Sequence, residues 1–136
     1  PDPNALRRSR PGDDAEWTTI PRDARVGAVV PEWPLDAPMS GYMQRRWVDL
    51  WSKPQASIWA RDEMVDLIAA YVLAFDESVQ PGASAGLKTA VLRMEAELGI
   101  SMLGMRANKW RLGDVADEAA VSVSAPVADI RSRLRK

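Results

Sequence analysis

Apolar residues recur at helical spacing through the middle of the chain. The first such stretch follows Pro38, where intervals of three and four residues place the apolar side chains on one face of a helix. These residues are Met39, Met43, Trp47, Leu50 and Trp51. The helix should end at Ser52-Lys53-Pro54, because the residue before a proline avoids helical backbone angles.

A second helix is predicted from Arg61 to Glu77, and its apolar residues are not confined to one face. One face contains Met64, Leu67, Ile68, Tyr71 and Phe75. The other faces carry Val65, Ala69, Ala70, Leu73 and Ala74. A helix that is apolar on all sides must be buried on all sides. Either part of its surface faces another subunit, or the helix is central and is wrapped by its own chain, and the pattern leaves both interpretations open.

Two more helices are predicted toward the C-terminus. Gln80-Pro81-Gly82 marks a turn, and Ser84 is placed to cap the helix that follows. The apolar repeat of that helix is Leu87, Val91, Met94 and Leu98. Gly99 lies where a helix-terminating glycine belongs, and the short connection predicts an antiparallel hairpin with the preceding helix. Ser101 is expected to cap a short fourth helix that runs to about Trp110.

The pattern divides the chain into three parts. Residues 1–36 have no sustained period and are interrupted by prolines, so they are predicted to form an extended N-terminal arm. Trp17 and Trp33 in this arm are expected to anchor it on a folded surface of the same subunit or of a neighbour. Residues 37–112 form the predicted helical core and oligomerisation domain, and residues 113–136 a flexible tail with a basic C-terminal segment. The predicted fold class is all-α, with a helical hairpin core and a proline- and tryptophan-rich arm.

Composition removes several kinds of chemistry. The chain contains no cysteine and no histidine, so it has no disulfides, no thiolate nucleophile and no imidazole for acid–base work near neutral pH. It has no Gly-Lys-Ser/Thr phosphate-binding loop. The acids Asp62, Glu63 and Asp66 could in principle hold a metal ion, but acids at the start of a helix are favoured by its dipole, which is the stronger interpretation. No cofactor is expected.

The longest purely apolar run, Leu67 to Phe75, is too short to span a bilayer. No signal peptide is visible. We therefore expect a reducing cytoplasm as the compartment.

Basic residues occur in local clusters although the net charge is only −1. Each cluster is by default a solvated face, but repeating one around an oligomer would create a belt of positive potential. The four clusters are Arg7, Arg8 and Arg10; Arg45, Arg46 and Lys53; Arg106, Lys109 and Arg111; and Arg131, Arg133, Arg135 and Lys136. The third contains three cations and no acid between Leu98 and Gly113, and lysines and arginines near phosphates supply most non-specific DNA affinity.

The chain also carries four motifs in a fixed order. They are EWTTIP (residues 16–21), PEWPL (31–35), LWSKPQASIW (50–59) and LGISMLGMRANKW (98–110). In this order and spacing they resemble the small terminase subunits of tailed phages, especially those of actinobacterial viruses. The resemblance extends from Pro3 to Trp110 and is poor after Gly113.

The resemblance implies a helical, non-enzymatic protein that assembles as a closed homo-oligomeric ring. Such a protein binds double-stranded viral DNA at the packaging-initiation site, and it recruits and regulates the large terminase, a separate ATPase–nuclease. The implied location is the host cytoplasm, and the protein is not expected in the mature virion. A helical hairpin typically builds the ring, and a terminal segment commonly engages the large subunit.

These considerations assign three sets of candidate residues. The predicted DNA-binding residues are Arg45, Arg46, Lys53, Arg106, Lys109 and Arg111. The predicted oligomer interface contains Leu67, Tyr71, Leu73, Phe75, Trp17 and Trp33. The predicted docking segment for the large subunit contains Ile130, Arg131, Arg133, Leu134 and Arg135.

Two other functions remain open. The first is a protein adaptor or virion assembly factor without DNA binding, which the net charge of −1 favours. The second is a small metal-dependent nuclease that uses the acids near Asp62, which the lack of histidine and of a metal motif opposes.

Overall fold

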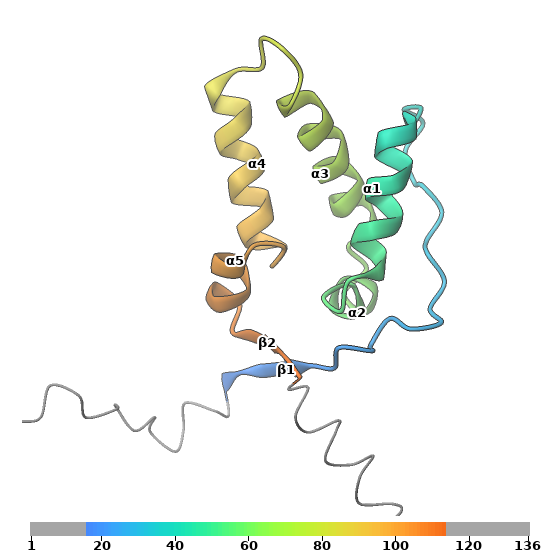
Figure 1. Ribbon diagram of the computed structural model, residues 1–136, viewed down its shortest axis with the longest axis vertical. Coiled ribbons are helices and arrows are strands. Elements are labelled where there is room, and N and C mark those ends of the chain that lie inside the picture. The colour runs from blue at the N-terminus through green and yellow to red at the C-terminus, as the bar shows by residue number, and fades with distance from the viewer. Residues whose placement is uncertain (1–15, 114–136) are drawn as a thin grey trace, which may run out of the picture.

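The computed structural model describes residues 16–113. This part of the chain is mostly helical, with one small two-stranded sheet (Figure 1). The elements in chain order are β1 (Thr18–Ile20), α1 (Gly41–Ser52), α2 (Ala56–Arg61), α3 (Val65–Ser78), α4 (Ala85–Glu97), α5 (Met102–Ala107) and β2 (Trp110–Leu112).

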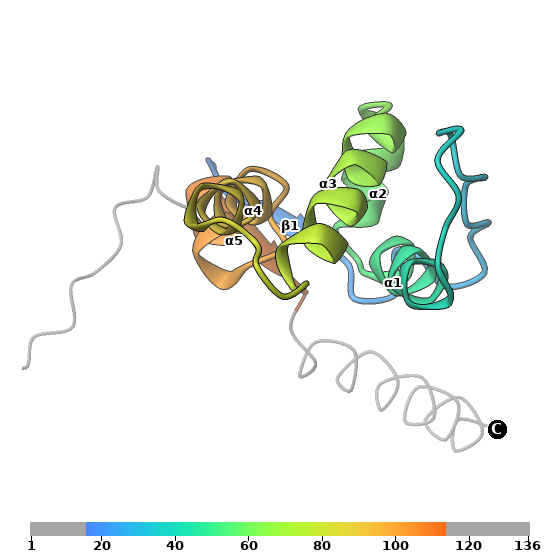
Figure 2. The same ribbon diagram turned by 90° about the horizontal axis from the view of Figure 1, so that it is seen from above.

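The three longest helices lie in a row with α3 in the middle, as Figures 1 and 2 both show. Helix α1 lies on one side of α3 and α4 on the other, and the segment between β1 and α1 follows the outer side of α1. Helix α5 lies beneath α4, and the small sheet crosses the base of the molecule (Figure 1). The predicted antiparallel hairpin is formed by α3 and α4.

Three helices begin with a capping serine, and for two of them, α4 and α5, the sequence predicts that serine. The Ser40 hydroxyl accepts a hydrogen bond from the Met43 amide at 3.2 Å and opens α1. Ser84 and Ser101 cap α4 and α5 in the same way, with distances of 3.1 and 3.0 Å. Gly99 has a φ of +68° after α4, and the Ile100 amide donates to the Glu95 carbonyl at 2.9 Å. This is the glycine-terminated helix end that the sequence predicts.

The predicted helix from Arg61 to Glu77 is wrong at its start. Helix α2 ends at Arg61, and α3 begins only at Val65. Between them Glu63 adopts a φ of +55°, and the Met64 amide donates to the Trp59 carbonyl at 2.9 Å. This arrangement closes a helix as a glycine would, but it uses a residue that gives no such signal in the sequence.

The predicted extension of the fourth helix to Trp110 is also wrong. Helix α5 ends at Ala107, and Lys109 adopts a φ of +55°. The chain then turns into β2, which pairs in parallel with β1: Thr18 is opposite Trp110, and Ile20 is opposite Leu112. The arm is therefore not wholly without regular structure, because its residues 18–20 form a strand. We call β1 and β2, with the residues that directly flank them (16–22 and 109–113), the strap, since they join two segments that lie about 90 residues apart in the sequence.

The core is built around tryptophans. The indole of Trp51 meets those of Trp47 and Trp59 edge to face, with ring centroids 5.6 and 5.9 Å apart, and all three side chains are buried. Trp33 from the arm packs edge to face on Trp47 at 5.0 Å. The Trp47 indole N–H donates to the Pro31 carbonyl at 2.8 Å. The arm thus docks at Trp33 on its own subunit, one of the two surfaces that the sequence left open.

Helix α3 is covered mainly by its own chain. Ile68, Ala69, Tyr71 and Val72 are buried, and α1 and α4 flank the helix (Figure 2). Leu67 remains 45% exposed. Of the other apolar positions, Ala70 is also exposed. The all-round apolar pattern is therefore explained largely by intrachain packing, with Leu67 and Ala70 left at the surface.

Candidate nucleic-acid interface

The strap gathers basic side chains from both ends of the described chain. Lys109 lies in the turn after α5, Arg111 lies on β2, and Arg22 follows β1. The Arg111 Nε donates to the Thr19 hydroxyl at 2.9 Å, and the Arg22 Nε donates to the Gly113 carbonyl at 2.6 Å. The sequence did not single out Arg22, because only the parallel pairing of β1 with β2 brings it beside the third basic cluster.

The same pairing brings a carboxylate to the cluster. Glu16 forms an ion pair with Lys109, and the two side chains are 62% and 47% exposed. The hydrogen bond and the positive charge of Lys109 lower the pKa of Glu16 below its ordinary value. Residues 98–113 contain no acid, but Lys109 nevertheless has a carboxylate beside it in the folded chain.

The remaining cation of the third cluster lies on α5. Arg106 is exposed in the last turn of that short helix. Helix α5 leads directly into the strap (Figure 1). Three of the six predicted DNA-binding residues therefore lie at one end of the molecule: Arg106, Lys109 and Arg111.

The second predicted cluster does not form one basic surface. Arg45 is exposed on α1, beside a shallow hollow of about 360 Å³ that Gln44, Val48 and Asp49 also line. Lys53 is half-buried after the end of that helix. Arg46 is half-buried and turns inward, where its Nη2 donates to the Tyr71 hydroxyl at 2.8 Å. Its role as a phosphate contact stays a prediction.

Arg46 belongs to a hydrogen-bonded chain that links three helices. Its guanidinium lies 4.4 Å from the ring centroid of Phe75. The Tyr71 hydroxyl in turn donates to Glu95 Oε1 at 2.8 Å. Burial and the bond to Glu95 raise the pKa of Tyr71 to about 12. The chain joins α1, α3 and α4, and its role is structural.

An apolar groove follows the outer half of the α3–α4 hairpin. Its volume is about 520 Å³, and its polar lining includes Lys88 and Glu95. The apolar lining is Phe75, Val79, Val91 and Leu92. Val79 and Leu92 are 58% and 65% exposed. This is the least covered apolar surface of the hairpin, and sequence reasoning missed both exposed residues because they lie off the predicted apolar repeats.

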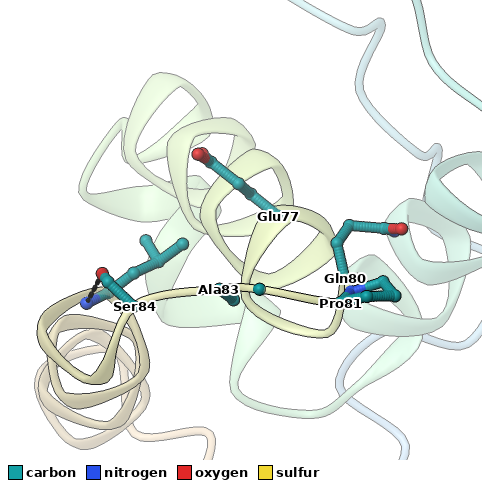
Figure 3. A pocket seen from close by; sticks show the side chains of 7 residues that line it. Glu77, Gln80, Pro81, Ala83 and Ser84 are labelled. Carbon is teal, nitrogen blue, oxygen red and sulfur yellow. Dashed lines mark hydrogen bonds between the residues drawn. The ribbon is translucent and has the colours of Figure 1, made fainter.

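A second hollow lies at the α3–α4 turn and is shown in Figure 3. Its volume is about 420 Å³. The side chains of Glu77 and Gln80 extend in different directions (Figure 3), and the Ser84 hydroxyl is already used to cap α4. Polar groups do not converge there, so it is a surface depression and not a binding site for a small molecule.

The predicted interface residues fall into two groups. Tyr71 is fully buried in its own subunit, so the prediction that it contacts a neighbour does not hold. The others retain some exposed surface and stay predictions: Leu67 is exposed, while Trp17, Trp33, Leu73 and Phe75 are half-buried. Trp33 also packs on Trp47 of its own chain.

The predicted docking residues Ile130, Arg131, Arg133, Leu134 and Arg135 lie outside the described residues. Within residues 16–113, no three histidine, cysteine, aspartate or glutamate side chains are grouped closely enough to hold a metal ion. No helix in this part of the chain has the length and apolar character needed to cross a membrane.

Known proteins give no further guide to this arrangement. Comparison of the chain with protein-family models, with curated proteins and with solved structures gave no match.

Proposed function

We propose that this chain is a small terminase subunit of a tailed phage. It binds double-stranded viral DNA at the packaging-initiation site, and it recruits and regulates the large terminase without catalysing a reaction itself. The observation that carries the DNA-binding part is the gathering of Arg22, Lys109 and Arg111 on the strap. Basic side chains held on a short backbone scaffold suit contact with phosphates, which needs charge and position but no base-specific chemistry.

The contacts between the four motifs also support the proposal. EWTTIP pairs with the end of LGISMLGMRANKW, because the Thr18 amide donates to the Lys109 carbonyl at 2.8 Å. LWSKPQASIW meets the start of the same motif, because the Trp59 indole N–H donates to the Leu98 carbonyl at 2.9 Å. PEWPL docks instead on Trp47 of α1, through Trp33. Three of the four segments that carry the resemblance thus contact one another.

Oligomerisation into a ring forms the second part of the proposal. Val79 and Leu92 expose apolar surface on one side of the hairpin, and Leu67 exposes more on α3. A surface patch that contacts a different patch on the next copy generates a ring when the rotation closes. Repeating the strap cations around that ring would give a positive belt despite the near-neutral subunit.

The first test is the native mass of the full chain, measured by light scattering after size-exclusion chromatography. The proposal predicts a single large multiple of the 15.0 kDa subunit. A monomer at micromolar concentration would overturn the ring.

The second test compares DNA affinity between two double variants. Arg22→Gln/Lys109→Gln removes two strap cations, while Arg61→Gln/Arg93→Gln removes the same charge from exposed positions on α2 and α4. Each lost phosphate contact should reduce the salt dependence of log K by about 0.9. The strap variant should therefore lose affinity and salt slope, and the control variant should retain both. Equal losses in the two variants would remove the strap as the DNA-contacting surface.

An adaptor without DNA binding is the second candidate. It is favoured by the net charge of −1 and by the pairing of Lys109 with Glu16. No binding of duplex DNA at low salt by a correctly folded, oligomeric protein would establish this alternative over the first.

A further inference from the structure

We infer that Glu16 is a built-in competitor for DNA at the strap, where its carboxylate occupies Lys109 in place of a phosphate. The inference rests on the proposed DNA-binding function and adds a means of limiting it. A carboxylate and a phosphate oxygen are both anionic hydrogen-bond acceptors, and a lysine ammonium can donate to either. The ammonium has three donor hydrogens, so Glu16 opposes a phosphate mainly by its negative charge, and Lys109 contributes its full charge to DNA binding only when Glu16 releases it.

The strap fixes Glu16 in this position. The Thr18 amide donates to the Lys109 carbonyl at 2.8 Å, which sets the segment before β1 directly against the turn before β2. Lys109 reaches this point through its left-handed backbone conformation, with a φ of +55°. The Glu16–Lys109 contact thus follows from the backbone pairing of two distant segments and not from their proximity in the sequence.

The ion pair is placed where an external anion can displace it. Both side chains are about half exposed, and an exposed ion pair contributes little to stability because water and salt screen it. The strap has other connections that hold it closed. These include the bond from the Gly113 amide to the Ile20 carbonyl at 2.8 Å and the bond from Arg22 to the Gly113 carbonyl.

Arg22 provides the contrast within the same surface. Its Nε donates to a neutral carbonyl oxygen, so this bond positions the guanidinium without neutralising its charge. The Lys109 ammonium is held by a carboxylate, which cancels its charge locally. Of these two strap cations, Lys109 is the one whose contribution to DNA binding depends on an internal anion.

The consequence is a lower affinity for isolated, non-specific DNA. One phosphate contact per subunit is opposed by Glu16, and a ring would repeat that opposition at each subunit. A DNA segment that lies along several straps at once would displace several carboxylates together, so the device would favour DNA that follows the ring over DNA that touches one subunit.

The test measures binding of a short fluorescent duplex of mixed sequence to the full chain by anisotropy, between about 50 and 200 mM salt. Glu16→Gln should bind more tightly, on the order of three- to tenfold, and its salt slope should be steeper by about 0.9 for each strap contact that is freed. Glu77→Gln is the matched control, because it removes the same charge from an exposed residue at the opposite end of the hairpin (Figures 1 and 3).

A double variant separates competition from a change in overall charge. In a Lys109→Gln background, Glu16→Gln should give no gain, because the cation for which it competes is gone. Equal affinities for Glu16→Gln and Glu77→Gln, or a gain that persists without Lys109, would overturn the inference while leaving DNA binding intact. Absence of binding by every variant, with circular dichroism showing folded protein, would overturn the proposed function and the inference together.

Discussion

The α1 side of the molecule and the α4 side are held in place by different interactions. Helix α1 buries a complete apolar face in the core, and this face includes two tryptophans of the cluster. Its residues are Met43, Trp47, Leu50 and Trp51. Helix α4 is one residue longer than α1, yet Val91 is its one buried residue, with Leu98 buried at its C-terminal cap. Its apolar residues therefore cannot account for its position in the way that those of α1 do.

Polar contacts and one close backbone approach fix the lower end of α4. The indole N–H of Trp59 donates to the Leu98 carbonyl at 2.9 Å, and Gln55 Nε2 donates to the Gly99 carbonyl at 3.2 Å. Asn108 Nδ2 donates to the Glu97 carbonyl at 3.1 Å. These bonds satisfy carbonyls that a helix end leaves without partners.

The comparison teaches that the buried core and the exposed apolar surface of the subunit lie in different parts of the chain. The tryptophan cluster supplies the buried area that stabilises the subunit. The outer half of α4 is anchored from below and leaves apolar side chains such as Leu92 at the surface. The strap lies beneath α5, at the end where α4 is most firmly fixed (Figure 1).

The largest expected effect on stability is at the tryptophan cluster. Trp59→Ala should lower the free energy of unfolding by about 3–5 kcal/mol, because it leaves a cavity in the core and removes the bond to the Leu98 carbonyl. Urea denaturation followed by circular dichroism measures the change. Leu92→Ala on α4 is the control, and its effect should stay within about 0.5 kcal/mol. Similar losses for the two variants would contradict the division of the molecule into a stabilising side and an anchored side.

The backbone approach between α4 and α5 gives the next largest effect. A Cβ on Gly104 would lie 2.4 Å from the Ala96 carbonyl oxygen, so Gly104→Ala must push α5 away from α4. We expect a loss of about 1–3 kcal/mol in the free energy of unfolding.

Gly86→Ala in the first turn of α4 is the matched control for this substitution. Its Cβ would meet nothing closer than 3.9 Å, and alanine favours helix over glycine by up to about 1 kcal/mol. In chemical denaturation, the free energy of unfolding should therefore fall for Gly104→Ala and rise for Gly86→Ala. Stabilisation by Gly104→Ala would show that α5 is not packed against α4 as described.

Tyr71 tests the hydrogen-bonded link between the two sides, because its hydroxyl bridges Arg46 on α1 and Glu95 on α4. Its pKa in the folded protein is about 12, above its ordinary 10.0. The neutral hydroxyl is thus favoured by folding, and the stability it contributes is complete below pH 10 and is lost as the pH rises toward 12. Midpoints of urea denaturation across this range should fall less steeply for Tyr71→Phe than for the natural chain. Parallel pH profiles for the two proteins would show that Tyr71 does not carry this dependence.

The sequence predicts helix ends well where a specialised residue marks them. Ser40, Ser84 and Ser101 cap their helices, although only the latter two were singled out from the sequence. Gly99 closes α4 as expected. Such residues act through local backbone geometry, which the sequence encodes within a few positions.

The two wrong helix boundaries share one physical cause. Glu63 and Lys109 both adopt left-handed backbone angles after a helix, which residues other than glycine rarely do. Nothing in the local pattern announces these turns, and tertiary packing must supply the energy that holds them. The strap was missed for a different reason: its strands are only three residues long and pair across most of the chain.

The candidate site was predictable in part. Arg106, Lys109 and Arg111 were identified as a cluster from sequence alone, since they are neighbours along the chain. Arg22 and Glu16 were not, because their relation to the cluster depends on the pairing of β1 with β2. The inward turn of Arg46 was equally hidden, because a solvated and a buried arginine have the same place in a helical repeat.

The smallest change in subunit stability is expected for a substitution on the exposed side of α4, which tests whether that side contacts another subunit. Leu92→Gln replaces a side chain that is 65% exposed, so the free energy of unfolding should change by less than about 0.5 kcal/mol. If the α3–α4 groove contacts a neighbouring copy, the same substitution places a polar amide in an apolar contact and should lower the native mass. Val29→Gln is the control, because Val29 is 85% exposed on the segment outside α1. A fall in native mass for Leu92→Gln alone would identify the groove as an assembly surface. An unchanged native mass in both variants would place any subunit contact elsewhere, and Leu92 would then be a solvated residue on a helix that is fixed only at its lower end.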